Sequence, residues 1–222
     1  LRPWTADLVA RTLHLMGGSL QALEHLLTHG GLSGNMAGGT HHAYRDYGSG
    51  YCIFNDLALC ALHALNAPSI HRILILDLDV HQGDGTAAIF ADTPEIVTCS
   101  VHGDKNFPVR KQRSDLDIAL PDNTQDAEYL DAIDSVLKQL PFDEFDLLLY
   151  QAGVDPLKAD RLGRLALSRD GLDRRNRRVF EEAAGVGIPV LIFMGGGYTE
   201  PITPTIDAFV DLFTAAAEFA DE

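Results

Sequence analysis

The chain has 222 residues, of which 46% are apolar and 22% charged, and this balance excludes a disordered chain and a collagen-like repeat. Its 32 Asp and Glu against 17 Lys and Arg give a formal charge of −15, which argues against direct nucleic-acid binding through a broad face. The acidity is compatible with a cationic partner and equally with a protein that its own charge keeps soluble.

Cysteine usage and hydropathy indicate the compartment. Cys52, Cys60 and Cys99 form no C-x-x-C pair, so the sequence indicates neither a disulfide framework nor a thiolate zinc finger. No apolar run approaches the roughly 18 residues of a membrane span, and the first residues lack a signal-peptide pattern. The sequence therefore predicts a cytoplasmic protein without a membrane partner.

The first half of the chain reads as two helices that lead into a strand. Thr5 is a suitable N-cap for a helix that runs to about His29, and a glycine-rich stretch follows at 38–50. Asn55 opens a second helix, which precedes a short apolar run at 72–77. Because this run is continuous rather than alternating, we expect a strand covered on both faces, as in a parallel sheet.

Three further apolar runs resemble the first, and helical patterns separate them. The runs cover 96–101, 145–151 and 188–194, and the helical patterns cover 124–140, 168–184 and a final helix from about Thr203. The final helix is expected to turn Ile206, Phe209, Phe213 and Ala217 inward. Strands that alternate with helices predict one α/β domain over residues 1–222 with a parallel β-sheet.

Polar side chains gather where these strands end. The first strand closes as Asp77-Leu-Asp79-Val-His81-Gln-Gly-Asp84, which places three carboxylates and an imidazole within eight residues. The third strand is followed by Ala-Gly-Val-Asp155. In parallel α/β sheets the active-site residues lie in the loops beyond the carboxyl ends of the strands, so we expect these side chains to share one edge of the sheet.

Two carboxylates and one imidazole form a credible metal site. Such a set leaves coordination positions open for water and substrate, and zinc or ferrous iron fits it. A single Asp at a strand end is more often a helix cap or a loop hydrogen bond. The whole D-x-D-x-H-x-G-D-G string favours a metal, because burying that much charge without one would be costly.

The glycine-rich stretch contains two adjacent histidines, His41 and His42. Alone, such a pair is more typical of a surface loop. Together with Asp77 and Asp84 it becomes a candidate acid–base pair, because a catalytic imidazole needs a carboxylate that fixes its tautomer and tunes its pKa. A Gly-Gly-Gly-Tyr198 turn could present a phenol to a developing oxyanion, and it is also compatible with an ordinary strand-to-helix turn.

The remaining histidines and an arginine cluster carry weaker signals. His102 follows a strand end and stays unassigned. Five arginines between Arg169 and Arg178 have the spacing of a solvated helix face rather than of a nucleic-acid patch. Five further histidines on helices or at their ends are expected to be surface or core residues: His14, His25, His29, His63 and His71.

Six motifs follow one another between about Asn35 and Tyr198. They are Gly-Gly-Thr-His-His-Ala, Gly-Ser-Gly-Tyr-Cys-Ile-Phe-Asn-Asp, Asp-Leu-Asp-Val-His-Gln-Gly-Asp-Gly-Thr, Ala-Gly-Val-Asp-Pro, Asp-Arg-Leu-Gly and Gly-Gly-Gly-Tyr. In this order the chain resembles the zinc-dependent histone deacetylases of the arginase/deacetylase superfamily and their bacterial relatives. The segment from Phe107 to Pro121 resembles the class IV branch. The resemblance implies the arginase/deacetylase fold, a single parallel β-sheet sandwiched by helices.

The resemblance also implies roles for individual residues. His42 would be the general base and acid, His41 its electrostatic partner, and Tyr198 would polarise the acyl carbonyl together with the metal. Asp77 and Asp84 would stand behind the two histidines. The implied zinc ligands are Asp79, His81 and Asp155. The positions that match the walls of an acyl-lysine tunnel are Tyr51, Phe107 and Leu162. A structural potassium ion would draw on Asp77, Asp79, His81, Ser100 and Val101.

The implied activity is hydrolysis of the amide of an N-acyl-lysine in a protein. Two alternatives are an amidohydrolase for acetylpolyamines or other small amides, and a catalytically silent scaffold that binds acyl-lysine. Binuclear manganese ureohydrolases share the fold but need further Asp and His ligands. Family members normally carry additional residues upstream of the position of Leu1, so we expect a deacetylase-like domain without its usual N-terminal portion. Oligomeric state and acyl-chain length stay open.

Overall fold

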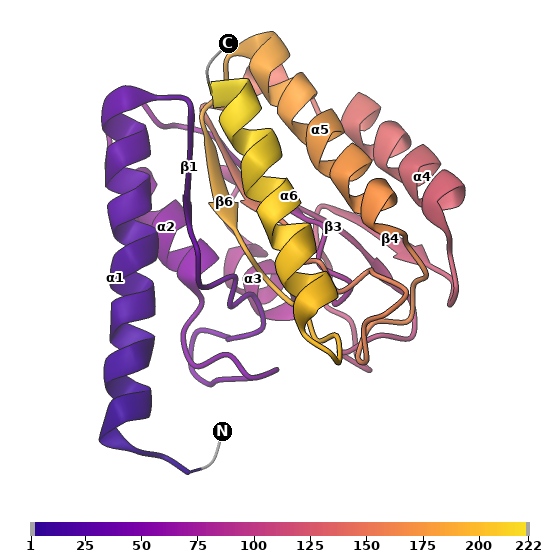
Figure 1. Cartoon of the computed structure of the whole chain (residues 1–222). Helices are drawn as coiled ribbons and strands as arrows, with labels where there is room; N and C mark the ends of the chain where they lie inside the picture. The colour runs from indigo at the N-terminus through magenta and orange to yellow at the C-terminus, as the bar shows by residue number, and fades with distance from the viewer. Residues whose placement is uncertain (1–2, 221–222) are drawn as a thin grey trace.

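A computed structural model describes residues 3–220 and contains a six-stranded sheet in which every neighbouring pair is parallel (Figure 1). The strand order is β1-β6-β5-β2-β3-β4. The strands are β1 (Leu32–Asn35), β2 (Ile73–Asp77), β3 (Ile96–Gly103), β4 (Leu116–Leu120), β5 (Leu147–Gln151) and β6 (Val190–Phe193). The predicted α/β class with a single parallel sheet is confirmed.

Helices cover both faces of this sheet. The helices are α1 (Ala6–His29), α2 (Asp56–Ala64), α3 (Asp84–Phe90), α4 (Asp126–Gln139), α5 (Arg169–Val186) and α6 (Thr203–Ala220), with a short 3₁₀ helix at Phe142–Glu144. Figure 1 shows α1 and α2 on one side of the strands and α4, α5 and α6 on the other. No helix within residues 3–220 is long and apolar enough to cross a membrane.

Strand β2 explains why the apolar runs do not alternate. Ile73 and Ile75 pack into the hydrophobic cluster beneath α1 and α2, whereas Leu74 and Leu76 pack into the cluster beneath α4, α5 and α6. All five residues of the strand are buried. Each such side chain contributes about 1.5–3 kcal/mol by leaving water, so the strand ends that carry the polar side chains are rigidly held.

The predicted helix starts agree with the observed caps. The Thr5 hydroxyl accepts a hydrogen bond from the backbone N–H of Leu8 at 3.1 Å. The Asn55 side chain accepts one from the N–H of Ala58 at 2.9 Å, at the start of α2. In both helices the cap satisfies one of the N–H groups that has no partner within the helix.

Two edge strands and one short helix are absent from the sequence prediction. Strand β1 reads Leu-Ser-Gly-Asn and is only partly buried. Strand β4 alternates between half-buried and exposed residues over its first four positions. Neither edge strand therefore carries the continuous apolar signal of an interior strand. Helix α3 begins at Asp84, inside the polar motif that follows β2.

The expected inward face of α6 is wrong at Ile206 and Ala217, whereas Phe209 and Phe213 are partly buried and pack against the core as expected. Ile206 is 52% exposed and Ala217 is exposed, and with Phe209 and Phe213 they line an open apolar groove. The helix instead buries Thr205, Ala208, Leu212, Ala215 and Ala216. Small side chains at four of these positions allow α6 to pack closely on its neighbours, and Ile206 lies to the side of this contact.

Candidate active site

The carboxyl ends of three adjacent strands build the centre of the site. Strand β5 lies between β2 and β6, so the loops after Asp77, Gln151 and Phe193 meet at one edge. Backbone groups tie these loops together: the N–H of Gly196 donates to Asp79 Oδ2 at 2.7 Å. The predicted convergence of the strand ends is confirmed.

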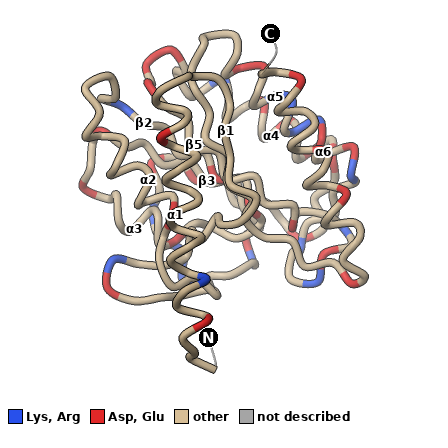
Figure 2. The backbone as a smooth tube through the Cα atoms, turned by 60° about the vertical axis from the view of Figure 1, so that its left-hand side comes forward, with Lys and Arg blue, Asp and Glu red and all other residues tan. Residues whose placement is uncertain are grey.

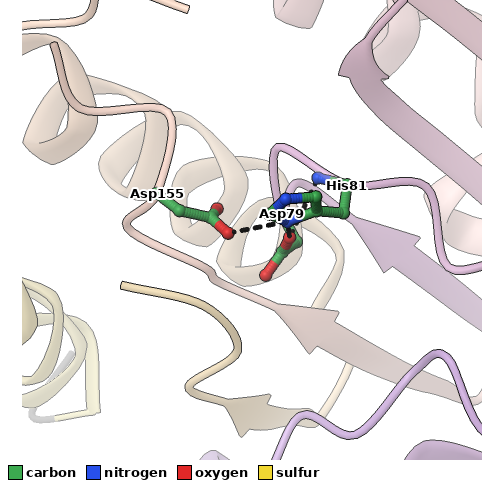
Figure 3. Close-up of side chains that lie close together, drawn as sticks. All are labelled: Asp79, His81 and Asp155. Atoms are coloured by element: carbon green, nitrogen blue, oxygen red, sulfur yellow. Dashed lines mark hydrogen bonds and ion pairs between the residues drawn. The ribbon is translucent and has the colours of Figure 1, made fainter. Parts of the chain in front are cut away.

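Asp79, His81 and Asp155 form a buried cluster of potential metal ligands (Figure 3). His81 Nδ1 lies 3.0 Å from Asp79 Oδ1 and 3.0 Å from Asp155 Oδ2. One ligand atom of each residue lies within 4.8 Å of the other two. The N–H of Val80 donates to Asp155 Oδ1 at 2.9 Å and so orients that carboxylate. This donor set of two carboxylates and one imidazole fits zinc or ferrous iron.

The electrostatics of this cluster favour a positive charge. Burial raises the pKa of Asp155 to about 7, and the neighbouring carboxylate of Asp79 adds to the effect. Burial opposes protonation of His81, but the hydrogen bonds that its Nδ1 makes to Asp155 and Asp79 outweigh burial and raise the pKa of His81 to about 10. Two carboxylates buried in contact are costly unless a cation compensates them, so the residues present suit a bound divalent ion.

Each of the two adjacent histidines is hydrogen-bonded to its own carboxylate. His41 Nδ1 lies 2.7 Å from Asp77 Oδ2, and His42 Nδ1 lies 2.6 Å from Asp84 Oδ1. Burial opposes protonation of His41, but Asp77 and Asp79 raise its pKa to about 9. Burial and the charge of His41 lower the pKa of His42 to about 4. The pair therefore combines a charged imidazole with a neutral one at neutral pH.

Residues at the start of α2 hold the histidine loop. Asn55 Nδ2 donates to the backbone carbonyl of His41 at 3.2 Å. The Asp56 carboxylate accepts hydrogen bonds from the N–H groups of Gly39 at 3.0 Å and Thr40 at 2.7 Å. Gly39 has a φ of +81°, and a Cβ there would meet the backbone of the loop after β6, so only glycine fits. The loop is therefore a fixed support for both imidazoles.

A cleft of about 530 Å³ reaches the metal-ligand cluster at His81. His42, His81 and Tyr198 line it, whereas His41 does not. The Phe107 ring stands edge-on to the His42 ring, with 4.9 Å between their centroids. Burial raises the pKa of the Tyr198 phenol, and Asp79 and Asp155 act in the same direction. The residues predicted as tunnel walls, Tyr51, Phe107 and Leu162, all line the cleft.

Besides Asp79 and His81, the residues predicted to bind potassium lie on strands β2 and β3. Asp77 and Ser100 are register partners on β2 and β3, and Val101 follows on β3. Ser100 Oγ lies 3.0 Å from Nδ1 of His102, the histidine that the sequence leaves unassigned. All four residues are buried. Potassium binding at this place stays a prediction.

Tyr44 and Arg175 belong to the site but are not among the site residues that the sequence predicts. The Tyr44 hydroxyl donates to Asp84 Oδ2 at 2.9 Å, so Asp84 binds both Tyr44 and His42. The only sequence signal for Tyr44 is its position next to the His-His-Ala motif. Arg175, predicted to lie on a solvated helix face, is instead fully buried. The five dispersed histidines are all exposed, as surface residues of helices and their ends.

Arg175 reaches from α5 to the strand ends. Its guanidinium donates to the carbonyl oxygens of Leu78 at 3.1 Å, Gly153 at 2.8 Å and Ala152 at 3.2 Å. It also donates to Asn176 Oδ1 through two N–H groups. The carbonyl acceptors lie in the two segments that carry Asp79 and Asp155. The helical period places this arginine on the inner face, and its polar partners explain its burial.

Comparison with known proteins places the chain among deacetylases. The histone deacetylase domain family matches residues 2–212. Histone deacetylase 2 of Arabidopsis thaliana is 33% identical over 187 residues, which cover 82% of this chain and 48% of that protein. An uncharacterized protein of Picosynechococcus sp. is 48% identical over 201 residues, which cover 90% of this chain and 67% of that protein.

Among solved structures, acetylpolyamine aminohydrolase from Burkholderia pseudomallei has a TM-score of 0.78 at 23% identity, covering 92% of this chain and 62% of that one. This similarity confirms the arginase/deacetylase fold. The chain belongs to the histone deacetylase family. It spans about half the length of the Arabidopsis relative and two thirds of the cyanobacterial one. Likeness to the class IV branch stays a prediction.

Proposed function

We propose that this protein is a zinc-dependent deacylase that hydrolyses the amide of an N-acyl-lysine. The observation that carries the proposal is that one cleft is lined both by His81, a member of the buried cluster with Asp79 and Asp155, and by His42. A bound divalent ion would supply a Lewis acid for the acyl carbonyl and lower the pKa of a water molecule. Membership of the histone deacetylase family supports the same activity.

In the proposed mechanism, His42 takes the proton of the attacking water and later gives it to the leaving amine. His42 suits this role because it lines the cleft and stays neutral, while Asp84 fixes its tautomer by binding Nδ1. His41, which does not line the cleft, contributes positive charge stabilised by Asp77. Tyr198 lines the same cleft and donates a hydrogen bond to the oxyanion as it forms.

The acid–base pair argues against the alternative of a silent scaffold. A protein that only binds acyl-lysine does not need two buried imidazoles, each with its own carboxylate partner. The binuclear manganese ureohydrolase alternative is also less well supported. Within residues 3–220, the metal-ligand geometry yields the single cluster of Asp79, His81 and Asp155.

The test is a fluorogenic acetyl-lysine peptide assay with and without a chelator, run beside a measurement of bound metal. We expect turnover that the chelator abolishes and zinc restores, with one ion per chain. Asp155→Ala should lose the ion, whereas Asp170→Ala, at a carboxylate that is 77% exposed, should retain it. Chelator-resistant turnover, or no turnover with one ion bound, would contradict the proposal. A panel of acetyl, butyryl and myristoyl peptides then measures acyl-chain preference.

A further inference from the structure

Two cationic side chains stand at the mouth of the cleft. Lys105 and Arg164 both line it, and no Asp or Glu does so among the described residues. Their side chains are 65% and 53% exposed, so both can meet a substrate from solvent. The nearby Lys111 is different, because its ammonium donates to the backbone carbonyls of Asp104, Asn106 and Pro108 within its own loop. The charge that faces the cleft therefore comes from Lys105 and Arg164.

These two cations share a single carboxylate. Asp122 Oδ2 lies 2.9 Å from Arg164 Nη1 and 3.7 Å from Lys105 Nζ. Asp122 does not itself line the cleft. One negative charge cannot neutralise both cations, and no other carboxylate forms an ion pair with either of them among the described residues.

Asn106 holds the two cationic segments together. Its side-chain amide donates to the carbonyl of Leu162 at 2.8 Å, and its Oδ1 accepts the N–H of Arg164 at 3.2 Å. These bonds join the segment of Lys105 to the segment of Arg164, although the residues are far apart in the chain. The positive mouth is thus a built feature of the cleft and not the chance approach of two flexible side chains.

The net charge of −15 does not cancel this local charge at the mouth. Exposed charges more than about 8 Å apart are largely screened at physiological ionic strength. In Figure 2 the acidic positions are distributed along the tube rather than gathered in one segment. A substrate seated at the mouth therefore meets Lys105 and Arg164 directly, whereas the nearby Asp160 carboxylate accepts the backbone N–H groups of Leu162 and Tyr198 and does not line the cleft.

We infer that the mouth of the cleft selects N-acyl-lysine peptides with an acidic residue beside the acylated lysine, and disfavours polycationic acylpolyamines. This inference rests on the proposed deacylase function and identifies its substrate class. A flanking carboxylate pairs with Lys105 or Arg164 while the acyl group enters the cleft. A polyamine instead brings its remaining ammonium groups against the same two cations. Such like-charge contacts weaken its binding relative to that of the peptide.

The test compares kcat/KM for three acetyl-lysine peptides that differ only in the flanking residues, which are Asp, Ala or Lys. N-acetylspermidine is the polycationic probe. We expect the Asp peptide to exceed the Lys peptide by about tenfold, because each exposed charge pair changes the rate constant by only a few fold. The K105M/R164M double variant should bring the ratio of kcat/KM for the Asp peptide to that for the Lys peptide within about twofold of unity. Sodium chloride at 0.5 M should also move the Asp-to-Lys ratio of kcat/KM toward unity, because salt screens exposed charges.

Arg174→Met is the matched control, because it removes one exposed arginine from α5 outside the cleft lining. It should keep the wild-type ratio. An Asp-to-Lys peptide ratio near unity in the wild type, or one that survives in the double variant, would overturn this inference while turnover of the Ala peptide upholds the proposed function. Faster turnover of N-acetylspermidine than of the Asp peptide would overturn it too. No turnover of any acyl substrate would overturn both.

Discussion

Replacing Arg175 by Met is expected to destabilise the fold and weaken metal binding together. The guanidinium is fully buried and makes five hydrogen bonds, three of them to the carbonyl oxygens of Leu78, Ala152 and Gly153. Met has a shorter, unbranched side chain of similar volume and has no donor. The substitution therefore leaves these three oxygens buried without the donor that orients them, while the volume of the side chain changes little.

The expected loss follows from counting acceptors. Each buried carbonyl that loses its donor costs about 1–3 kcal/mol of stability. Part of this total cost is offset, because the variant no longer buries the charge of the guanidinium. Asn176 Oδ1 keeps a partner, because the Tyr150 hydroxyl donates to it at 2.7 Å. We therefore expect a decrease of about 3–5 kcal/mol in the free energy of unfolding. Arg175→Lys, which keeps the charge but fewer donors, should lose about half as much.

Urea denaturation of the metal-free protein measures the stability, and titration with Co²⁺ followed by visible absorption measures metal affinity. Arg174→Met is the control: that neighbour is exposed and paired with Asp170 at 3.9 Å, so its loss should change stability by less than about 0.5 kcal/mol. If Arg175→Met stays within 0.5 kcal/mol of the wild type, the buried hydrogen bonds do not have the assigned energetic weight. If stability falls while Co²⁺ affinity is unchanged, Arg175 supports the fold but not the ligands.

Three further predictions concern the site. Tyr198→Phe should retain zinc and lower kcat by at least about tenfold, since it removes the hydrogen-bond donor to the oxyanion. Metal analysis and steady-state kinetics measure the two effects. An unchanged kcat would contradict the role assigned to Tyr198. Asp155→Ala should lose zinc, and full occupancy by metal analysis would refute the ligand set. Asp84→Asn should lower kcat by about a hundredfold with little change in KM, because His42 loses the anion that fixes its tautomer. A matching rise in KM would point to a misfolded cleft instead.

The interior of the fold could be predicted from sequence because interior strands have a distinctive pattern. The run over Ile73–Asp77 is buried on both faces, and its lack of alternation correctly predicted a parallel sheet covered by helices. Helix starts at Thr5 and Asn55 could be predicted because a cap is a local interaction. The edge strand at Leu32–Asn35 could not, since it is four residues long, contains Ser, Gly and Asn, and is defined only by its pairing with β6.

The same distinction separates the parts of the site that sequence could predict from those it could not. Asp79 and His81 lie within one short motif, and the rule that parallel strands deliver their ends to one edge adds Asp155. Arg175 carries no comparable signal, because its burial depends on carbonyl oxygens contributed by two other segments. The pairing of Lys105 and Arg164 at the mouth likewise depends on Asn106 joining two distant loops. The chemistry of the site is thus encoded in contiguous motifs, whereas its support and its choice of substrate arise from contacts that only the folded chain creates.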